Sequence, residues 1–387
     1  MSSLDITVVF SAYALALLIA LLTTGTPSDH VGRRPVLLGA LAVQVASMAL
    51  FATVGGLTTL IGARVLQGIA TGAAGAALLD LEDLVRPGRP ALANSIAPVT
   101  GMAAGVLAAT LMVRCTPVPT ITVYAAQIAV FAAQAIALVS TPETVRRRPG
   151  ALRSTRPHLA LPSAAAHALL LNSAGVVAVW ALGGFYSFLG PGFTRLISPG
   201  GPEYADGMVF FTLTAVAAPT VYITRRMRAD VSAPLGNCAV IPAAALTLGA
   251  LHLAGPVLLV AGAALAGFGF GAVSQGALRA VVDSVPARGK GGTLASYYVL
   301  SYLAMSLPAV GAGALTAGFD LRAAALAYAG CVAALATVAV ATLTASLRSR
   351  RRTPSPDAHS RPATSNYTSA SPDTPAPDTS VLATHDR

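Results

Sequence analysis

The chain has 387 residues, of which 55% are hydrophobic and only 10% are charged, and its mean hydropathy is +0.69. Soluble proteins carry charge on about a quarter of their residues, so this composition excludes an ordinary soluble fold. The formal charge of +10 can indicate nucleic-acid binding, but basic residues of a membrane protein first mark its cytoplasmic loops, so we expect no nucleic-acid partner.

Apolar stretches long enough to cross a bilayer recur along the chain, separated by short polar breaks. They predict an all-α polytopic membrane protein with about eleven transmembrane helices. The predicted spans cover about residues 6–24, 35–54, 57–80, 91–113, 120–140, 163–190, 206–224, 236–252, 256–279, 293–316 and 323–347.

Basic residues gather in the loops on one side of these predicted helices. Of the 25 basic residues, only Arg114, Arg195 and Arg322 fall in the loops of the other side, and Arg64 falls inside a span. Cytoplasmic loops are enriched in arginine and lysine, so the crowded side is cytoplasmic. We therefore expect a multi-pass protein of the plasma membrane, embedded in the lipid bilayer, with its amino terminus outside and its carboxyl terminus in the cytoplasm.

One cytoplasmic loop divides the predicted helices into two bundles. It covers residues 142–162, and its arginines and prolines indicate a linker. The predicted domains are an amino-terminal bundle of five helices over residues 1–141 and a carboxyl-terminal bundle of six over residues 163–347. Residues 348–387 are rich in Ser, Thr, Pro and Asp without apolar periodicity, which predicts a disordered cytoplasmic tail.

The two bundles share a sequence pattern. The segment LQGIATGA at residues 66–73 matches LAGFGFGA at 265–272, and ALANS at 91–95 matches TLASY at 293–297. The offset is about 200 residues, and repeated halves are common in secondary transporters. Because the helix at 163–190 has no counterpart within the chain, we expect an initial helix with about 35–40 upstream residues to be missing, through a misplaced start or a genuine loss.

Charge is concentrated in one short segment, TPSDHVGRRPVLLG at residues 26–39. Gly25 and Gly32 permit a tight turn between two helices. Asp29 can meet a helix amino terminus, and Arg33 can meet an acidic partner. These properties indicate a cytoplasmic loop that ties helices together.

The segment from Gly25 to Arg34 resembles the loop between helices two and three of the major facilitator superfamily, especially of its twelve-helix drug and proton antiporters. The likeness extends over about residues 6–347 and implies a secondary transporter whose two bundles rock around a midplane site. In that family the loop latches the two bundles in the outward-facing state. By analogy we pair Arg33 with Asp80 or Asp83.

Two further segments resemble motifs of the same superfamily. Arg64, Gly68 and Gly72 match its fourth-helix motif, an arginine followed by glycines at four-residue spacing. An arginine inside a span should face a polar interior and have a partner, although snorkelling to the interface is the alternative because Arg64 is only about 10 Å from the end of its span. Pro98 and Gly101 occupy the position of the antiporters' fifth-helix motif, with two of its glycines replaced.

Aromatic and polar residues of the second half form the candidate substrate cavity. Amphipathic rings suit hydrophobic or cationic ligands, and transporter sites form near the midplane beside loosened helices. For each residue taken singly, packing between helices is the alternative. The candidates are Trp180, Tyr186, Phe270, Gln275, Tyr298 and Tyr302.

All 15 acidic residues fall in loops, helix ends or the tail, so no protonatable carboxylate is visible within a span. The group that couples transport to a proton gradient then lies in the missing helix, or His167 titrates instead. The three cysteines are scattered singly without metal-ligand spacing, so we expect neither a metal nor another cofactor.

The sequence lacks zinc-protease, nucleophile-elbow and phosphate-loop motifs, which disfavours an intramembrane enzyme and a transport ATPase. We therefore predict a monomeric transporter, not an enzyme, that exports small hydrophobic or amphipathic molecules by alternating access. Uptake of a metabolite and a nonfunctional truncated transporter are the alternatives.

Overall fold

The computed structural model describes residues 3–79, 90–141, 143, 162–201, 205–285, 290–318 and 321–352. Residues Met1–Leu347 form one compact unit, and Arg348–Arg387 form a second. The fold of the first unit is described below.

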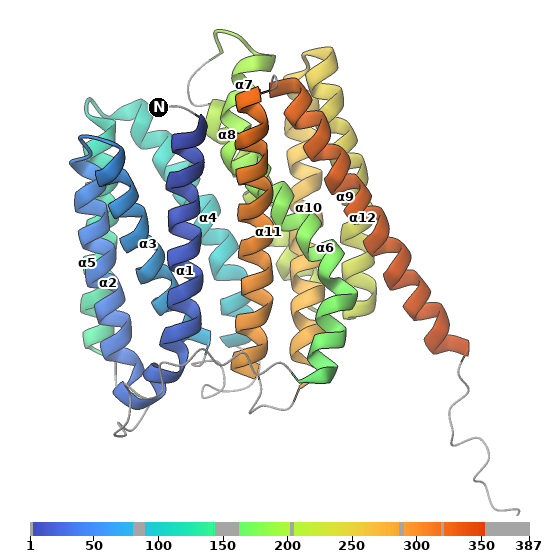
Figure 1. The fold of residues 1–387 in the computed structure, drawn as a ribbon, viewed down its shortest axis with the longest axis horizontal. Helices are drawn as coiled ribbons and strands as arrows, with labels where there is room; N and C mark the ends of the chain where they lie inside the picture. The colour runs from blue at the N-terminus through green and yellow to red at the C-terminus, as the bar shows by residue number, and fades with distance from the viewer. Residues whose placement is uncertain are drawn as a thin grey trace, which may run out of the picture. The chain divides into compact units, whose positions relative to one another are not determined.

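The described residues form α-helices joined by short connections, with no strand among them (Figure 1). The first five helices precede the linker at residues 144–161, and the others follow it. Their bounds are α1 Ser3–Val31, α2 Arg33–Ala52, α3 Leu57–Leu79, α4 Pro90–Cys115, α5 Pro119–Val139, α6 Ser163–Phe188, α7 Gly190–Ile197, α8 Ala205–Thr224, α9 Ala229–Leu253, α10 Pro256–Val282, α11 Lys290–Gly318 and α12 Leu321–Arg352.

These helices confirm the prediction of an all-α, multi-pass membrane protein. Within the described residues, 8 helices are long and apolar enough to cross a membrane, and Val8–Thr24 is a shorter apolar stretch inside α1. Every predicted span corresponds to one long helix. The short helix α7 lies between two predicted spans, where the sequence indicated only a loop.

The helix α1 differs from its prediction at its carboxyl end. The sequence placed Gly25 in a tight turn, but α1 continues through this residue to Val31. The chain turns at Gly32 instead, whose φ of 102° is in the left-handed region that favours glycine. One glycine therefore makes the turn between α1 and α2, and the other lies inside a helix.

Glycines bring the backbones of several helix pairs into close contact, and two of these pairs correspond to each other in the two halves. In the first half, a Cβ atom added at Gly68 or Gly72 of α3 would collide with the carbonyl oxygens of Tyr13 or Leu17 of α1. Glycines at four-residue spacing allow such close approach between membrane helices. Only small residues can occupy these positions of α3.

In the second half, Gly267 and Gly271 of α10 meet the carbonyl oxygens of Leu213 and Ala217 of α8 in the same way. These two glycines are the ones that match Gly68 and Gly72 in the repeated sequence pattern. The pair α8–α10 is therefore the counterpart of the pair α1–α3.

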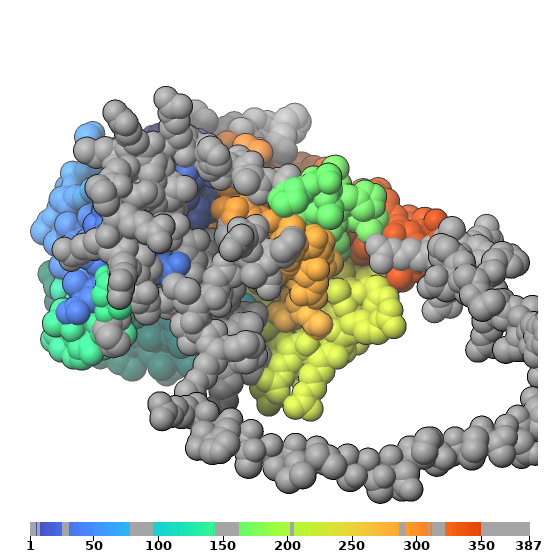
Figure 2. Space-filling view, turned by 90° about the horizontal axis from the view of Figure 1, so that it is seen from below, coloured from blue at the N-terminus to red at the C-terminus, as the bar shows by residue number. Residues whose placement is uncertain are grey.

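Both halves meet along helices far apart in the sequence. The helix α1 lies beside α11, and α4 lies beside α8. The helix α11 also lies beside α6. Figure 2 shows this from below, where the orange residues of α11 are next to the green residues of α6. Thus α11 is placed between a helix of the first half and a helix of its own half.

Candidate functional site

Arg64 lies on α3 among groups from three other helices of the first half. The centre of its guanidinium group is 5.2 Å from the ring centroid of Phe51 on α2 and 6.0 Å from that of Tyr13 on α1. These distances are within the range of cation–π attraction. On the same side, the ring of Tyr124 on α5 stacks on that of Phe51, with 5.4 Å between the ring centroids. The side chain is therefore held between helices.

The hydrogen bonds of Arg64 leave part of its guanidinium group without a partner. Its Nη1 donates to Oε1 of Gln67 at 2.9 Å, while its buried Nε has no hydrogen-bond partner. No carboxylate in the described part of the chain pairs with this side chain. An arginine inside a membrane helix normally pairs with an acid or a carbonyl, so Arg64 has unused capacity for an acceptor.

Four of the predicted cavity residues come together in the second half. The ring of Trp180 on α6 is 5.3 Å from that of Phe270 on α10 and 5.8 Å from that of Tyr302 on α11. The ring of Tyr298 is 6.4 Å from that of Tyr302. We call Trp180, Phe270, Tyr298 and Tyr302 the aromatic cluster. Phe270 is buried and the other three rings are half-buried.

The other two predicted cavity residues lie apart from this cluster. Tyr186 is only 1% exposed, and its hydroxyl group shares a hydrogen bond with that of Thr247 on α9. It belongs to the packed core of the second half, together with Phe185 and Tyr328. Gln275 is buried on α10, and no contact joins it to the aromatic cluster among the described interactions.

Neighbouring helices bring the aromatic cluster close to the environment of Arg64. Tyr13, whose ring lies beside Arg64, is on α1, which packs beside α11, the helix of Tyr298 and Tyr302. One helical turn away on α1, Phe10 packs edge-on against Phe188 of α6 with 4.1 Å between ring centroids. The arginine and the aromatic cluster therefore lie on opposite sides of one junction between the halves.

The Gly-Arg-Arg sequence meets a carboxylate that the sequence reasoning did not assign to it. The backbone N–H groups of Arg33 and Arg34 donate to the carboxylate oxygens of Glu143, at 3.2 and 3.1 Å. A carboxylate at a helix amino terminus satisfies free N–H groups and complements the helix dipole. A Cβ atom at Gly32 would lie 2.8 Å from this carboxylate, so the glycine also provides space for it.

Arg34 makes the reciprocal contact at the end of α5. Its guanidinium group donates to the carbonyl oxygens of Thr141, at 3.3 Å, and Val139. Glu143 thus binds the start of α2 while Arg34 binds the end of α5, and all of these contacts lie within the first half. The proposed pairing of Arg33 with Asp80 or Asp83 involves two acids that lie outside the described residues. The surroundings of Gly25 and the side chain of Asp29 also lie outside the described part of the chain.

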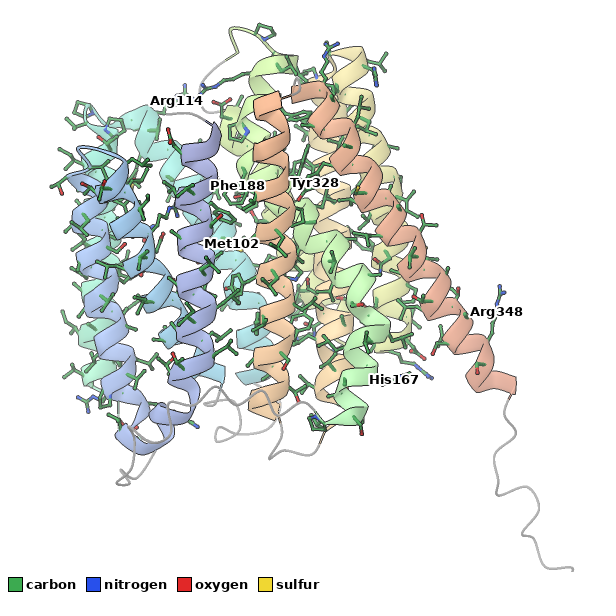
Figure 3. All side chains as sticks on the ribbon, viewed as in Figure 1. Met102, Arg114, His167, Phe188, Tyr328 and Arg348 are labelled. Carbon is green, nitrogen blue, oxygen red and sulfur yellow. The ribbon has the colours of Figure 1, made fainter. Side chains whose placement is uncertain are left out.

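The remaining predicted motif residues lie on α4. Pro98 is inside this helix and exposed, and a Cβ atom at Gly101 would have nothing within 4 Å. Their surroundings on α4 are therefore open, in contrast to the close crossing at Gly68 and Gly72. His167 is exposed in the first turns of α6. It lies at the opposite end of the helices from Arg114 (Figure 3).

Sequence reasoning missed Tyr13, Phe51 and Glu143. A signal existed for Tyr13, since a single tyrosine interrupts an apolar span, but its relation to Arg64 depends on the α1–α3 crossing. Within the described residues, no group of three or more His, Cys, Asp or Glu side chains is placed to hold a metal ion. The candidate site therefore provides a cation, the Arg64 guanidinium group, and the aromatic rings of the cluster for contact with a ligand.

Comparisons with known proteins give one family. The family model described as Major Facilitator Superfamily matches residues 1–307. No curated protein matches the sequence. Many solved structures share the fold, among them two transporters. The human organic anion transporter MFSD10 (TETRAN) is 22% identical, with a TM-score of 0.59 over 87% of this chain and 83% of that one. The nucleoside transporter NupG, as its D323A mutant, is 13% identical, with a TM-score of 0.68 over 88% and 91%.

Proposed function

Because the chain belongs to the Major Facilitator Superfamily, a family of membrane transporters and not of enzymes, we propose that it exports small hydrophobic or amphipathic compounds. It does so by alternating access, in which the two halves rock around a site near the midplane. The likeness to the two solved transporters supports the fold, and it does not identify the substrate of this chain.

The observation that carries this proposal is the aromatic cluster at the junction of the halves. Trp180, Tyr298 and Tyr302 are half-buried, so their rings keep accessible surface. Ligand sites are lined mainly by apolar and aromatic side chains with a few polar groups that set orientation. Tyrosine and tryptophan provide both properties, which suits molecules with an apolar body and a polar end.

We extend the proposal to the setting in which the transporter works. Its basic loops favour a plasma-membrane protein with the Gly-Arg-Arg loop in the cytoplasm. It acts as a monomer on a small-molecule substrate, without a cofactor, and a proton gradient drives it.

Efflux of a neutral fluorescent dye tests the proposal. Cells that express the full chain are loaded with N-phenyl-1-naphthylamine, and its retention is followed over time. We expect expressing cells to lose the dye faster than cells without the chain, and a protonophore to abolish the difference. Trp180→Ala and Tyr302→Ala should slow efflux, because each removes a ring from the cluster.

A matched control is Leu170→Ala, since Leu170 is on the same helix as Trp180 but is 73% exposed. This variant should retain full efflux at equal membrane levels. Equal dye retention with and without the chain would contradict the proposal. Faster dye accumulation in expressing cells would instead favour uptake.

A further inference from the structure

Arg64 carries a positive charge that no acidic residue pairs with in the part of the chain that the structure describes. All 15 acidic residues of the sequence fall in loops, helix ends or the tail, whereas Arg64 lies within α3. Its described partners are Gln67 and two aromatic rings, which are neutral. A charge inside a membrane protein is costly unless it is paired, so this arginine is poised to receive an anion.

The arginine also has the hydrogen-bonding capacity that an anion needs. Its Nε is buried without an acceptor, and only Nη1 is engaged, by Gln67. A guanidinium group binds carboxylates, sulfonates and phosphates through two parallel N–H donors. The rings of Phe51 and Tyr13 lie within 5.2 and 6.0 Å of the guanidinium carbon and restrict its motion, which reduces the entropy lost when the anion binds.

The position of the aromatic cluster indicates what the part of the ligand beyond its acidic group should be like. The ring of Tyr13 on α1 lies beside Arg64 in the first half, and α1 packs beside α11, which carries Tyr302 of the cluster in the second half. A molecule that spans this junction would place its acidic group at Arg64 and its apolar body against Tyr302 and Trp180. Neutral or cationic molecules would leave the arginine unneutralised.

We propose that the substrates are amphipathic anions, whose acidic group binds the Arg64 guanidinium and whose apolar part packs on the aromatic cluster. This inference rests on the proposed function and names the substrate class of that site. In this proposal Arg64 binds the substrate directly, and the bound anion contacts both halves.

Two probes that share their rings separate the charge from the apolar body. 8-Anilinonaphthalene-1-sulfonate carries one sulfonate, and N-phenyl-1-naphthylamine is the same molecule without it. Binding is followed by energy transfer from Trp180, the only tryptophan of the chain, in the purified full chain in lipid nanodiscs. The Trp180→Phe protein measures the emission of directly excited probe, and only the energy transfer that saturates with probe concentration is counted as binding, because transfer to probe dissolved in lipid does not saturate.

The tested variants are Arg64→Gln and Arg64→Lys, with Arg114→Gln as the control because Arg114 is an exposed arginine at the end of α4. We expect Arg64→Gln to weaken binding of the sulfonate on the order of tenfold or more. The neutral probe should bind unchanged to all variants. Arg64→Lys should be intermediate, because lysine keeps the charge but loses the planar fork, and it carries the test if Arg64→Gln does not fold.

Three results would overturn the inference. If Arg64→Gln binds the sulfonate as tightly as the wild type, Arg64 is not the anion site. If it loses both probes equally, Arg64 serves packing. In both cases the proposed function stands, since the neutral probe binds the wild type. If neither probe gives energy transfer above the Trp180→Phe signal, the proposed function fails together with the inference.

Discussion

The helix pairs α1–α3 and α8–α10 have the same crossing but different side chains around it. Gly68 and Gly72 in one pair and Gly267 and Gly271 in the other bring backbones together in the same register. Seven residues into α3 stands the half-buried Arg64, whereas the matching position of α10 is Ala263, which is 0% exposed. Both halves share the crossing, but only the crossing of the first half has an arginine at this position.

The packing around the two crossings differs as well. In the second half one large core joins helices α6 to α10 and α12, whereas a cluster around Met48, Phe51 and Ala63 serves the first half. No residue of α5 is buried. A charged group is tolerated more easily where few apolar side chains surround it, so the looser half is the one suited to a polar site.

The largest expected effect comes from moving the charge to the other crossing. Ala263→Arg places a guanidinium group in the tightly packed core of the second half, without space or a partner. We expect almost complete loss of folded protein, since an unpaired buried charge costs several kcal/mol or more. Fluorescence-detected size-exclusion chromatography measures the folded fraction.

Val257→Arg is the control for this substitution, because Val257 is near the start of the same helix and is 79% exposed. Its longer side chain can reach the membrane interface, so folded protein should be retained. Normal folding of Ala263→Arg would show that the second half accepts a charge as the first half does.

Added volume at the crossing glycines should have the next largest effect. Gly72→Ala and Gly271→Ala each place a methyl group against a backbone carbonyl of the partner helix. We expect each to reduce the free energy of unfolding by about 1–3 kcal/mol, as overpacked cores do. Denaturant titration of the purified protein measures the change.

The matched control is Gly101→Ala, whose Cβ atom would have nothing within 4 Å. It should be neutral or slightly stabilising, because alanine favours the helix by up to about 1 kcal/mol. If Gly72→Ala is destabilising and Gly271→Ala is not, the two crossings are not equivalent.

The hydrogen bonds that join helix ends in each half should give a smaller effect. In the second half, Nη1 of Arg279 at the end of α10 donates to the carbonyl oxygens of Arg225 and Met227, both at 2.7 Å. Arg279→Gln leaves these carbonyls to water, and we expect a loss of about 1–2 kcal/mol in the free energy of unfolding. Arg226→Gln is a control on the same connection.

Glu143→Gln should have the smallest effect. Glutamine keeps one oxygen for the N–H groups of Arg33 and Arg34 but removes the charge that favours the start of α2. The expected loss is about 0.3–1 kcal/mol, and high salt should reduce it. Denaturant titrations at low and high salt measure both quantities, and a salt-independent loss would contradict the electrostatic account.

Sequence predicted the spans, because hydropathy is a local signal that does not depend on the partner helix. The sequence also showed the repeated glycine spacing, but not which helices cross at these glycines. It did not predict the contacts of Glu143, which lies 110 residues from Arg33 and meets backbone N–H groups rather than a charged side chain. Nor did it separate Tyr186 from the aromatic cluster. A helix that is apolar on every face gives no indication of which side faces the core.

The two kinds of helix contact also differ in how they respond to sliding. Within each half, the glycine crossings press backbone against backbone, so a shift along the axis would drive carbonyl oxygens into the facing helix. Between the halves, side chains make contacts such as the edge-on packing of the Phe10 and Phe188 rings. Such rings can change rotamer and exchange neighbours. Backbone contacts thus join the helices of each crossing, whereas exchangeable side-chain contacts join the halves, so we expect any sliding to occur at the boundary between the halves.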